Sequence, residues 1–334
     1  MCGLYYAKQP LYARDFKAQG AMAALLKDAF KPNLVQTLEN NPIIMHGGPF
    51  ANIAQGTNSV VATKMALRLG DYVVTEAGFG FDLGGEKFLN LKCRTAGLAP
   101  ELVVLVVTIR ALKYHGGAAQ EELNQPNLKA LESGLSNLER HLQNAKKFGL
   151  PAVVAINRFT TDTDQELAFV QEQCEAWDTP AEICDHWAQG GTGAVKLAQA
   201  VLATIAEGKN DFQLLYGSQD PLVDKIRTVA RQIYGAREVQ FSDQAQRDCR
   251  RIEALRLDEL PVCLAKTQYS FSDNPKAIGP PKDFVLHIRQ VELAAGAGFV
   301  VPITGTMMRM PGLPKEPAAH AIDIDAEGSI TGLF

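Results

Sequence analysis

The sequence predicts an α/β protein built from mostly parallel sheets with helices on both faces. Short apolar runs alternate with longer amphipathic segments along most of the chain, which is typical of repeated strand–helix units. The run LVVLVVT at residues 102–108 is continuous and mostly β-branched, as expected of a central parallel strand that is buried on both faces. A similar run at residues 152–156 begins a second unit, so we expect more than one α/β lobe.

Apolar periodicity predicts the elements of the first unit. The expected elements are an edge strand at residues 3–7, helices over 13–30 and 59–69, and strands over 33–37, 42–45 and 72–75. After the strand at 102–108 we expect a long amphipathic helix over 123–148. Gly134 is expected to break that helix, since glycine is a poor helix former.

Two glycine-rich loops, at residues 46–56 (HGGPFANIAQG) and 78–85 (GFGFDLGG), stand about one helix and one strand apart. This alternation predicts that both lie at one edge of a parallel sheet, where open α/β folds bind ligands. Helices that begin beside the loops would favour an anion such as phosphate. The alternative interpretation is that the glycines only form turns and that Phe50, Phe79 and Phe81 only fill the core.

Two basic residues are candidates for a catalytic role. His46 follows the strand at 42–45 and precedes two glycines, so it would bind substrate or position phosphate; alternatively it only bonds a turn carbonyl. Arg110 follows the strand at 102–108 and has Lys113 and His115 nearby, which suits a polyanionic ligand. The alternative for this second group is a solvated basic loop.

Two aromatic residues end successive strands of the second unit. Phe159 follows the strand at 152–156, and Trp187 follows a short strand at 182–184. Their rings could sandwich a flat heterocycle, each stacking contact adding about 1 kcal/mol beyond burial. The alternative is an aromatic pair in the core. Thr161 is expected to cap a helix over residues 162–176.

The last third of the chain is less regular. We expect a helix that opens at residues 190–193, helices over 220–234 and 242–257, and a strand over 261–265. An exposed or antiparallel strand is expected over 284–292 and a loop over 294–310. The polar and aromatic segment at 266–273, KTQYSFSD, either contacts a ligand or caps the sheet.

Composition excludes several classes of function. The chain has 334 residues, a net charge of −4, 46% hydrophobic and 21% charged residues, and six scattered cysteines. An acidic chain argues against a nucleic-acid partner, and no apolar run is long enough to span a membrane. We therefore expect a cytoplasmic protein that binds neither nucleic acid nor membrane. With no CxxC pair, the cysteines are expected to be reduced, and no metal site is expected.

Several long segments together have the pattern of a known family. They are NPIIMHGGPFANIAQGTNSVVATK, LGDYVVTEAGFGFDLGGEKF, VTIRALKYHGG, AINRFTTDTDQEL, AKTQYSFSD, ITGTMMRMPGLP and AIDID. These segments resemble the matching parts of the formate–tetrahydrofolate ligases. The resemblance covers nearly the whole chain. It implies a P-loop-NTPase-like or Rossmann-like fold and ligation of formate to tetrahydrofolate, through formyl phosphate, to give 10-formyltetrahydrofolate. It also implies ATP with Mg²⁺, with a monovalent cation left open, and a homotetramer.

The resemblance assigns site residues and domains. It implies nucleotide binding at Ala51, Phe79 and Gly84 and folate binding at Phe159, Ile183 and Trp187. The expected domains are the remainder of a nucleotide-binding domain (1–150), a folate-side domain (151–270) and a C-terminal lobe with closing loops (271–334). Thr160 replaces the usual proline, and Thr306 stands where relatives usually carry an acidic residue.

One departure from the family decides the expected activity. Relatives carry a phosphate-binding glycine loop with a lysine in an N-terminal portion, and no GxxxxGK[ST] occurs in these 334 residues. We therefore expect a truncated first domain and a chain that is inactive alone. It would be a fragment, a split-gene product with a separate N-terminal half, or an inactive paralogue. One alternative is a truncated relative or subunit that binds folate or nucleotide without catalysis. If the resemblance is set aside, the other alternative is a generic nucleotide-dependent α/β enzyme. If the chain is active, Lys64, Lys87 and Lys113 are the first candidates for the lysine.

Overall fold

A three-stranded parallel sheet forms the centre of the first lobe. The computed structural model describes residues 2–4, 9–305 and 315–332. The strands are β5 (Val103–Val107), β6 (Ala152–Asn157) and β7 (Ala181–Cys184), in the order β5-β6-β7. Helices join and cover them, so the predicted α/β class is confirmed. These helices are α4 (Ile109–His115), α5 (Leu128–Lys147), α6 (Asp164–Ala176) and α8 (Val195–Ala206).

The core of this lobe lies between β6 and the helices α5 and α6. Val154 and Ile156 of β6 are fully buried against leucines of α5 and against Leu167 and Val170 of α6. Because β6 is the central strand and helices pack on the sheet, the side chains of β6 are almost all buried. Since the three strands are parallel, the carboxyl ends of β5, β6 and β7 lie at the same edge of the sheet, next to this core.

The strand β5 is an edge strand, and the prediction that it is buried on both faces is wrong. Within the described residues β5 pairs only with β6, and the side chain of Val106 is 65% exposed. A β-branched run predicts a central parallel strand only when strands or helices cover both sides of it. Val107, at the carboxyl end, is buried and begins the turn into α4.

The helix α5 runs unbroken through Gly134, so the predicted break is also wrong. A Cβ on Gly134 would lie 1.9 Å from the carbonyl oxygen of Leu112 in α4, and one on Gly116 would lie 1.7 Å from the carbonyl oxygen of Ala130. Glycine here allows two helix backbones to touch rather than ending a helix.

The helix α6 begins two residues later than predicted. Its N-cap is Thr163, which forms a capping box with Glu166, and not Thr161.

A second sheet organises the other lobe. Its strands are β8 (Glu238–Phe241), β9 (Val285–Ala294) and β10 (Phe299–Thr304), with β8 parallel and β10 antiparallel to β9. The antiparallel strand expected near 284–292 is confirmed, whereas the loop expected over 294–310 is wrong for β10. Segment 261–265 forms only isolated bridges to β10, at Val262 and Ala265. Helices α9 (Leu222–Val229), η6 (Ala230–Tyr234) and α10 (Asp243–Ala254) pack on this lobe, and Ser242 caps α10.

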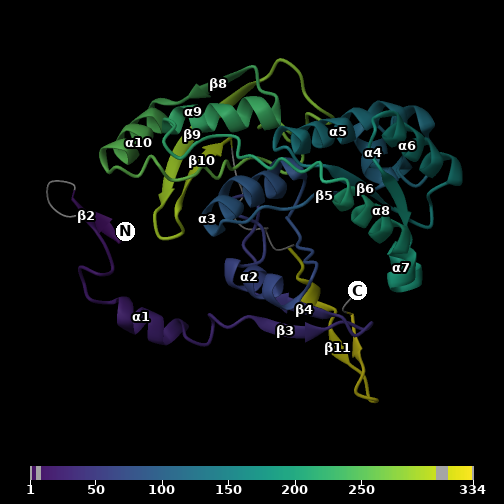
Figure 1. Ribbon diagram of the computed structural model, residues 1–334, viewed down its shortest axis with the longest axis horizontal. Coiled ribbons are helices and arrows are strands. Elements are labelled where there is room, and N and C mark those ends of the chain that lie inside the picture. The colour runs from purple at the N-terminus through teal and green to yellow at the C-terminus, as the bar shows by residue number, and fades with distance from the viewer. Residues whose placement is uncertain (1, 5–8, 306–314, 333–334) are drawn as a thin grey trace.

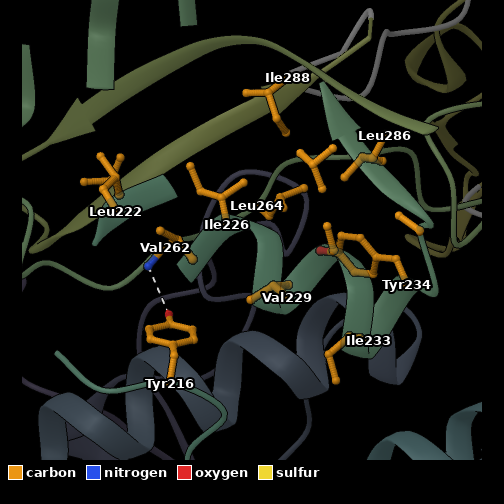
Figure 2. Close-up of a cluster of buried hydrophobic side chains, with 14 of the residues drawn as sticks. Tyr216, Leu222, Ile226, Val229, Ile233, Tyr234, Val262, Leu264, Leu286 and Ile288 are labelled. Atoms are coloured by element: carbon orange, nitrogen blue, oxygen red, sulfur yellow. Dashed lines mark hydrogen bonds between the residues drawn. The ribbon is translucent and has the colours of Figure 1, made fainter. Parts of the chain in front are cut away.

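One hydrophobic core joins the two lobes. Phe148, just after α5, and Phe81 are buried in the same cluster as residues of α9, η6, β8, β9 and β10. Figure 2 shows Leu222 and Ile226 on the side of α9 toward the strands, and Tyr216, whose hydroxyl accepts a hydrogen bond from the Val262 N–H at 3.1 Å. The two lobes are therefore packed against each other through apolar side chains.

The N-terminal arm lies along one side of the two lobes in Figure 1. It comprises β1 (Gly3–Leu4), β2 (Pro10–Leu11), α1 (Gln19–Leu26), β3 (Asn33–Gln36), β4 (Pro42–Met45) and α2 (Val60–Leu69). The helix expected over 13–30 is shorter, and residues 72–75 form no strand. Residues 5–7 of the expected first strand lie outside the described residues.

The strands β3 and β4 form an antiparallel hairpin. The prediction that both glycine loops lie at one edge of a parallel sheet is therefore wrong, because the first loop follows a hairpin strand.

The remaining elements are short. They are η2 (Phe81–Gly85), η3 (Phe88–Cys93), α3 (Arg94–Ala96), η4 (Gln120–Glu122), α7 (His186–Gln189), η5 (Gly190–Ala194), η7 (Ala318–His320), β11 (Asp323–Ile324) and β12 (Ile330–Thr331). In the described ranges, none of the helices has the length and apolar character needed to cross a membrane.

Candidate functional site

The two glycine loops meet directly, although no parallel sheet holds them. Thr57 pairs with Ala77 in an isolated bridge, and the Gly78 N–H donates to the Gly56 carbonyl oxygen at 2.9 Å. Buried Ala51 packs beneath this junction, 3.5 Å from the position of a Gly78 Cβ. Gly84 closes it from the other side, since a Cβ there would lie 2.0 Å from the Gly78 carbonyl oxygen. The structure thus brings Ala51, Gly84 and the segment that carries Phe79 together.

The three phenylalanines of the loops have different environments. Phe81 is buried in the main core and makes an edge contact with Phe148 at a centroid distance of 6.1 Å. Phe79 is 50% exposed and has a backbone φ of +61°, which residues other than glycine rarely adopt. Phe50 is also exposed. The core interpretation therefore holds for Phe81 but not for Phe50 or Phe79.

A buried polar cluster lies under the second loop. The Asp82 carboxylate is 2.6 Å from the Lys266 Nζ, and both side chains are almost fully buried. The Lys266 ammonium also donates to the Ser270 carbonyl oxygen and lies 5.0 Å from the Tyr234 ring centroid. Burial raises the pKa of Asp82, but the nearby Lys266 and His141 lower it by more. The pKa of Asp82 is therefore below its usual value. Asp82 is therefore held as a carboxylate inside the protein.

His46 holds two elements together in this structure. Its Nδ1 lies 2.8 Å from the Ser59 hydroxyl at the start of α2, and its Nε2 lies 2.8 Å from the Ala29 carbonyl oxygen. Because a carbonyl oxygen only accepts, Nε2 carries the proton and Nδ1 accepts from Ser59. Both ring nitrogens are engaged, so proton transfer by His46 would require one of these bonds to break.

The second group of predicted residues lies at the carboxyl edge of the parallel sheet. Phe159 follows β6 and is 39% exposed, Trp187 in α7 is 83% exposed, and Ile183 in β7 is half-buried. The guanidinium carbon of Arg110, at the start of α4, lies 5.6 Å from the Phe159 ring centroid. Asn157 and Cys184 are paired across β6 and β7, so Phe159 and Trp187 leave neighbouring strand ends. An aromatic and cationic surface results.

The turn after β6 fixes the position of Phe159. The Phe159 backbone N–H donates to Asp162 Oδ2 at 2.8 Å, and the Asp162 backbone N–H donates to the Phe159 carbonyl oxygen at 3.0 Å. Burial raises the pKa of the Asp162 carboxyl group. We did not select Asp162 from the sequence, although an aspartate three residues after an aromatic residue is a turn signal.

Two of the basic residues predicted to bind a ligand, Lys113 and His115, have partners within the protein. Lys113 forms a buried ion pair with Glu166 at 3.0 Å and donates to the Gln125 carbonyl oxygen. His115 accepts a hydrogen bond from the Gly279 N–H, and burial lowers its pKa. The Lys113 ammonium is therefore not free to bind a ligand, one ring nitrogen of His115 is already engaged, and Arg110 is half-buried beside the Phe159 ring.

The lysines proposed as substitutes for a glycine-loop lysine differ in access. Lys87 is fully buried, as is Lys113, while Lys64 is exposed on α2.

No group of three His, Cys, Asp or Glu side chains gathers as a metal site in the parts of the chain that the structure describes. Thr306 lies outside those parts. All six cysteines are free, and five of them are buried.

Comparison with known proteins identifies the family of the chain. A family model described as formate–tetrahydrofolate ligase matches residues 1–334. The chain belongs to the formate–tetrahydrofolate ligase family. A relative from Paracoccus denitrificans (strain Pd 1222), named formate–tetrahydrofolate ligase, is 55% identical over 332 residues. That match covers 99% of this chain and 60% of the relative. The family predicted from the sequence is thus confirmed, and the chain spans about three fifths of the relative's length.

Proposed function

We propose that this chain provides the adenine and folate sites of an ATP-dependent ligase that joins formate to tetrahydrofolate. The observation that carries the proposal is the junction of the two glycine loops, which presents an exposed Phe79 ring beside buried Ala51 and Gly84. The name of the Paracoccus relative supports it. An exposed ring held between two glycines has little protein to pack against, so it suits a flat adenine base.

The surface at the carboxyl edge of the parallel sheet is the proposed folate site. Phe159, Trp187 and Ile183 would contact the flat pterin, and Arg110 adds a positive charge beside the Phe159 ring. In the reaction, the N10 lone pair attacks the carbonyl carbon of formyl phosphate, the carbon–oxygen bond to phosphate breaks, and N10 loses its proton. The residues of this chain contribute by binding and orienting the two substrates.

The transferred phosphate and Mg²⁺ need contacts beyond the adenine and folate sites. Mg²⁺ in nucleotide sites is usually held by one or two carboxylates and by the phosphates themselves. The described residues contain no cluster of three His, Cys, Asp or Glu side chains, so Mg²⁺ would be held chiefly by the phosphates. We propose that the glycine-loop lysine is supplied by polypeptide outside these 334 residues, because no such motif occurs within them.

The folate site is tested by Trp187→Ala. We expect tetrahydrofolate binding to weaken by about 1–3 kcal/mol, through lost stacking and burial, while ADP binding is unchanged. Isothermal titration calorimetry with both ligands measures this. Tyr72→Ala, which removes an exposed aromatic ring from another surface, is the matched control. Unchanged folate affinity in Trp187→Ala would show that the aromatic pair is not the folate site.

The second candidate function is a non-catalytic relative or subunit that keeps folate or nucleotide affinity. The observation that favours it is the burial of Lys87 and Lys113, which removes two of the three internal candidates for a phosphate-binding lysine. Both functions predict the same binding sites, and a turnover assay with added polypeptide separates them.

A further inference from the structure

Phe79 has a backbone conformation that must be imposed by its surroundings. A φ of +61° is unfavourable for a residue with a side chain, and the exposed ring gains little packing in return. Such strain persists only where neighbouring contacts fix the chain on both sides. On the N-terminal side, the Gly78 N–H bond to Gly56 provides this contact.

On the C-terminal side, the contact is a buried carboxylate. A Cβ on Gly80 would lie 2.6 Å from Asp82 Oδ1 and 3.3 Å from His141 Cε1, so the carboxylate packs directly on the Gly80 backbone. The Leu83 and Gly84 N–H groups donate to the Gly80 carbonyl oxygen at 3.0 and 3.1 Å. The position of Asp82 therefore fixes the residue that follows Phe79.

Asp82 is itself held by a distant segment. Its Oδ2 lies 2.6 Å from Lys266 Nζ, which also donates to the carbonyl oxygens of Thr267 and Ser270. Lys266 directly follows Ala265, which bridges to β10. The ion pair thus connects the second glycine loop to the sheet of the other lobe.

We propose that the buried Asp82–Lys266 ion pair positions Phe79 for the adenine nucleotide. The proposal rests on the proposed adenine role of Phe79 and assigns Asp82 and Lys266 as positioning residues that do not touch the ligand. Without the pair, Lys266 no longer holds the side chain at position 82 against the Gly80 backbone, and Phe79 relaxes to a negative φ. The ring then leaves the junction where Ala51 and Gly84 lie.

The test is a double-mutant cycle read by ADP binding. Asp82→Asn is made alone and in a Phe79→Ala background, and ADP and tetrahydrofolate affinities are measured by calorimetry on the full chain. We expect Asp82→Asn to weaken ADP binding about tenfold in the Phe79 background and to have almost no effect in the Phe79→Ala background. Folate affinity is unchanged in all variants. Asp224→Asn, which removes the exposed Asp224–Arg227 pair, is the matched control.

Two further measurements keep the proposal testable if one variant folds poorly. Asp82→Asn combined with Lys266→Met removes both charges, so no unpaired charge is left buried; we expect the same loss of ADP affinity. Hydrogen exchange needs no ligand, and the Leu83 and Gly84 amides should exchange faster in Asp82→Asn than in Asp224→Asn.

The possible failures are distinguishable. An equal loss of ADP affinity in both backgrounds, or no loss in either, would overturn the positioning role while the adenine role of Phe79 stands. If Phe79→Ala alone binds ADP as tightly as the unmodified chain, the adenine role is wrong, and the positioning role is lost with it.

Discussion

At the scale of single residues, Glu86 places a carboxyl group in the interior of the protein. It is fully buried, and its Oε1 accepts a hydrogen bond from Asn90 Nδ2 at 2.7 Å. Its Oε2 has no hydrogen-bond partner among the described residues. Burial raises the pKa of Glu86 from 4.5 to about 7, because an ionised carboxylate loses its hydration there. The folded chain therefore binds a proton that the unfolded chain releases between these two values.

This difference makes stability depend on pH. The part of the folding stability that depends on protonated Glu86 is fully present below pH 4.5 and is lost as the pH rises through about 7. We expect Glu86→Gln to be more stable than the unmodified chain by up to about 3 kcal/mol above pH 7, and to show little difference near pH 4.5. Urea unfolding of both proteins across this range measures the effect. Glu132→Gln, on the exposed face of α5, is the control, and a pH-independent difference for Glu86→Gln would contradict the expectation.

Single residues also show how far the site could be predicted from the sequence. Phe79, Phe159 and Trp187 are identifiable because glycines or strand ends surround them, where a large ring has no local packing partner. Asp82 and Lys266 are not identifiable in this way. A charged residue in a glycine loop is expected to be solvated, and its burial depends on a partner far along the chain.

At the scale of elements, the contact between α4 and α5 depends on two glycines. The Gly134 backbone touches the Leu112 carbonyl group so closely that a Cβ would lie 1.9 Å from its oxygen. Both atoms belong to backbone, which cannot move aside as a flexible side chain can. The helices must therefore separate to accept any side chain at this position.

We expect Gly134→Ala to destabilise the chain by about 1–3 kcal/mol, the usual cost of overpacking, despite the better helix propensity of alanine. Gly20→Ala in α1 is the matched control, because no atom lies within 4 Å of its Cβ position, and it should be neutral or stabilising by up to about 1 kcal/mol. Thermal and urea unfolding of the two variants compare these effects. Equal stability of both variants would contradict the close contact.

Elements differ in how well the sequence predicts them. The strands β3, β4, β6 and β7 and the helices α2 and α10 follow local periodicity and were predicted correctly. The pairing of the strands was not predicted correctly. Periodicity does not say whether a strand pairs in a hairpin, as β3 and β4 do, or lies at the edge of a sheet, as β5 does. The strand β10 was missed since glycine and proline near it indicate a loop, although its interior is fully buried.

At the scale of the whole molecule, two surfaces have apolar character. The N-terminal arm exposes many large side chains, among them Leu25, Phe30, Leu34, Leu38, Leu69 and Val74. The strand β5 exposes Val106, and along its outer edge it pairs with no other strand among the described residues. Apolar surface of this extent marks an interaction site, and an open edge strand is a template for further pairing. We expect the part of the longer relative that lies outside the match to cover both surfaces.

The last prediction concerns turnover and assembly together. We expect the 334-residue chain alone to self-associate and to show no formate-dependent ADP release, because losing even one preorganised donor to the transferred phosphate costs about 10²–10³ in rate. Adding the part of the Paracoccus relative outside the match should restore ADP release and reduce self-association, measured by coupled assay and sedimentation velocity. The added part alone, and the mixture made with Trp187→Ala, are the controls. Robust ADP release by the chain alone would contradict this proposal, and Lys64 would then be the residue to replace first, since Lys87 and Lys113 are buried.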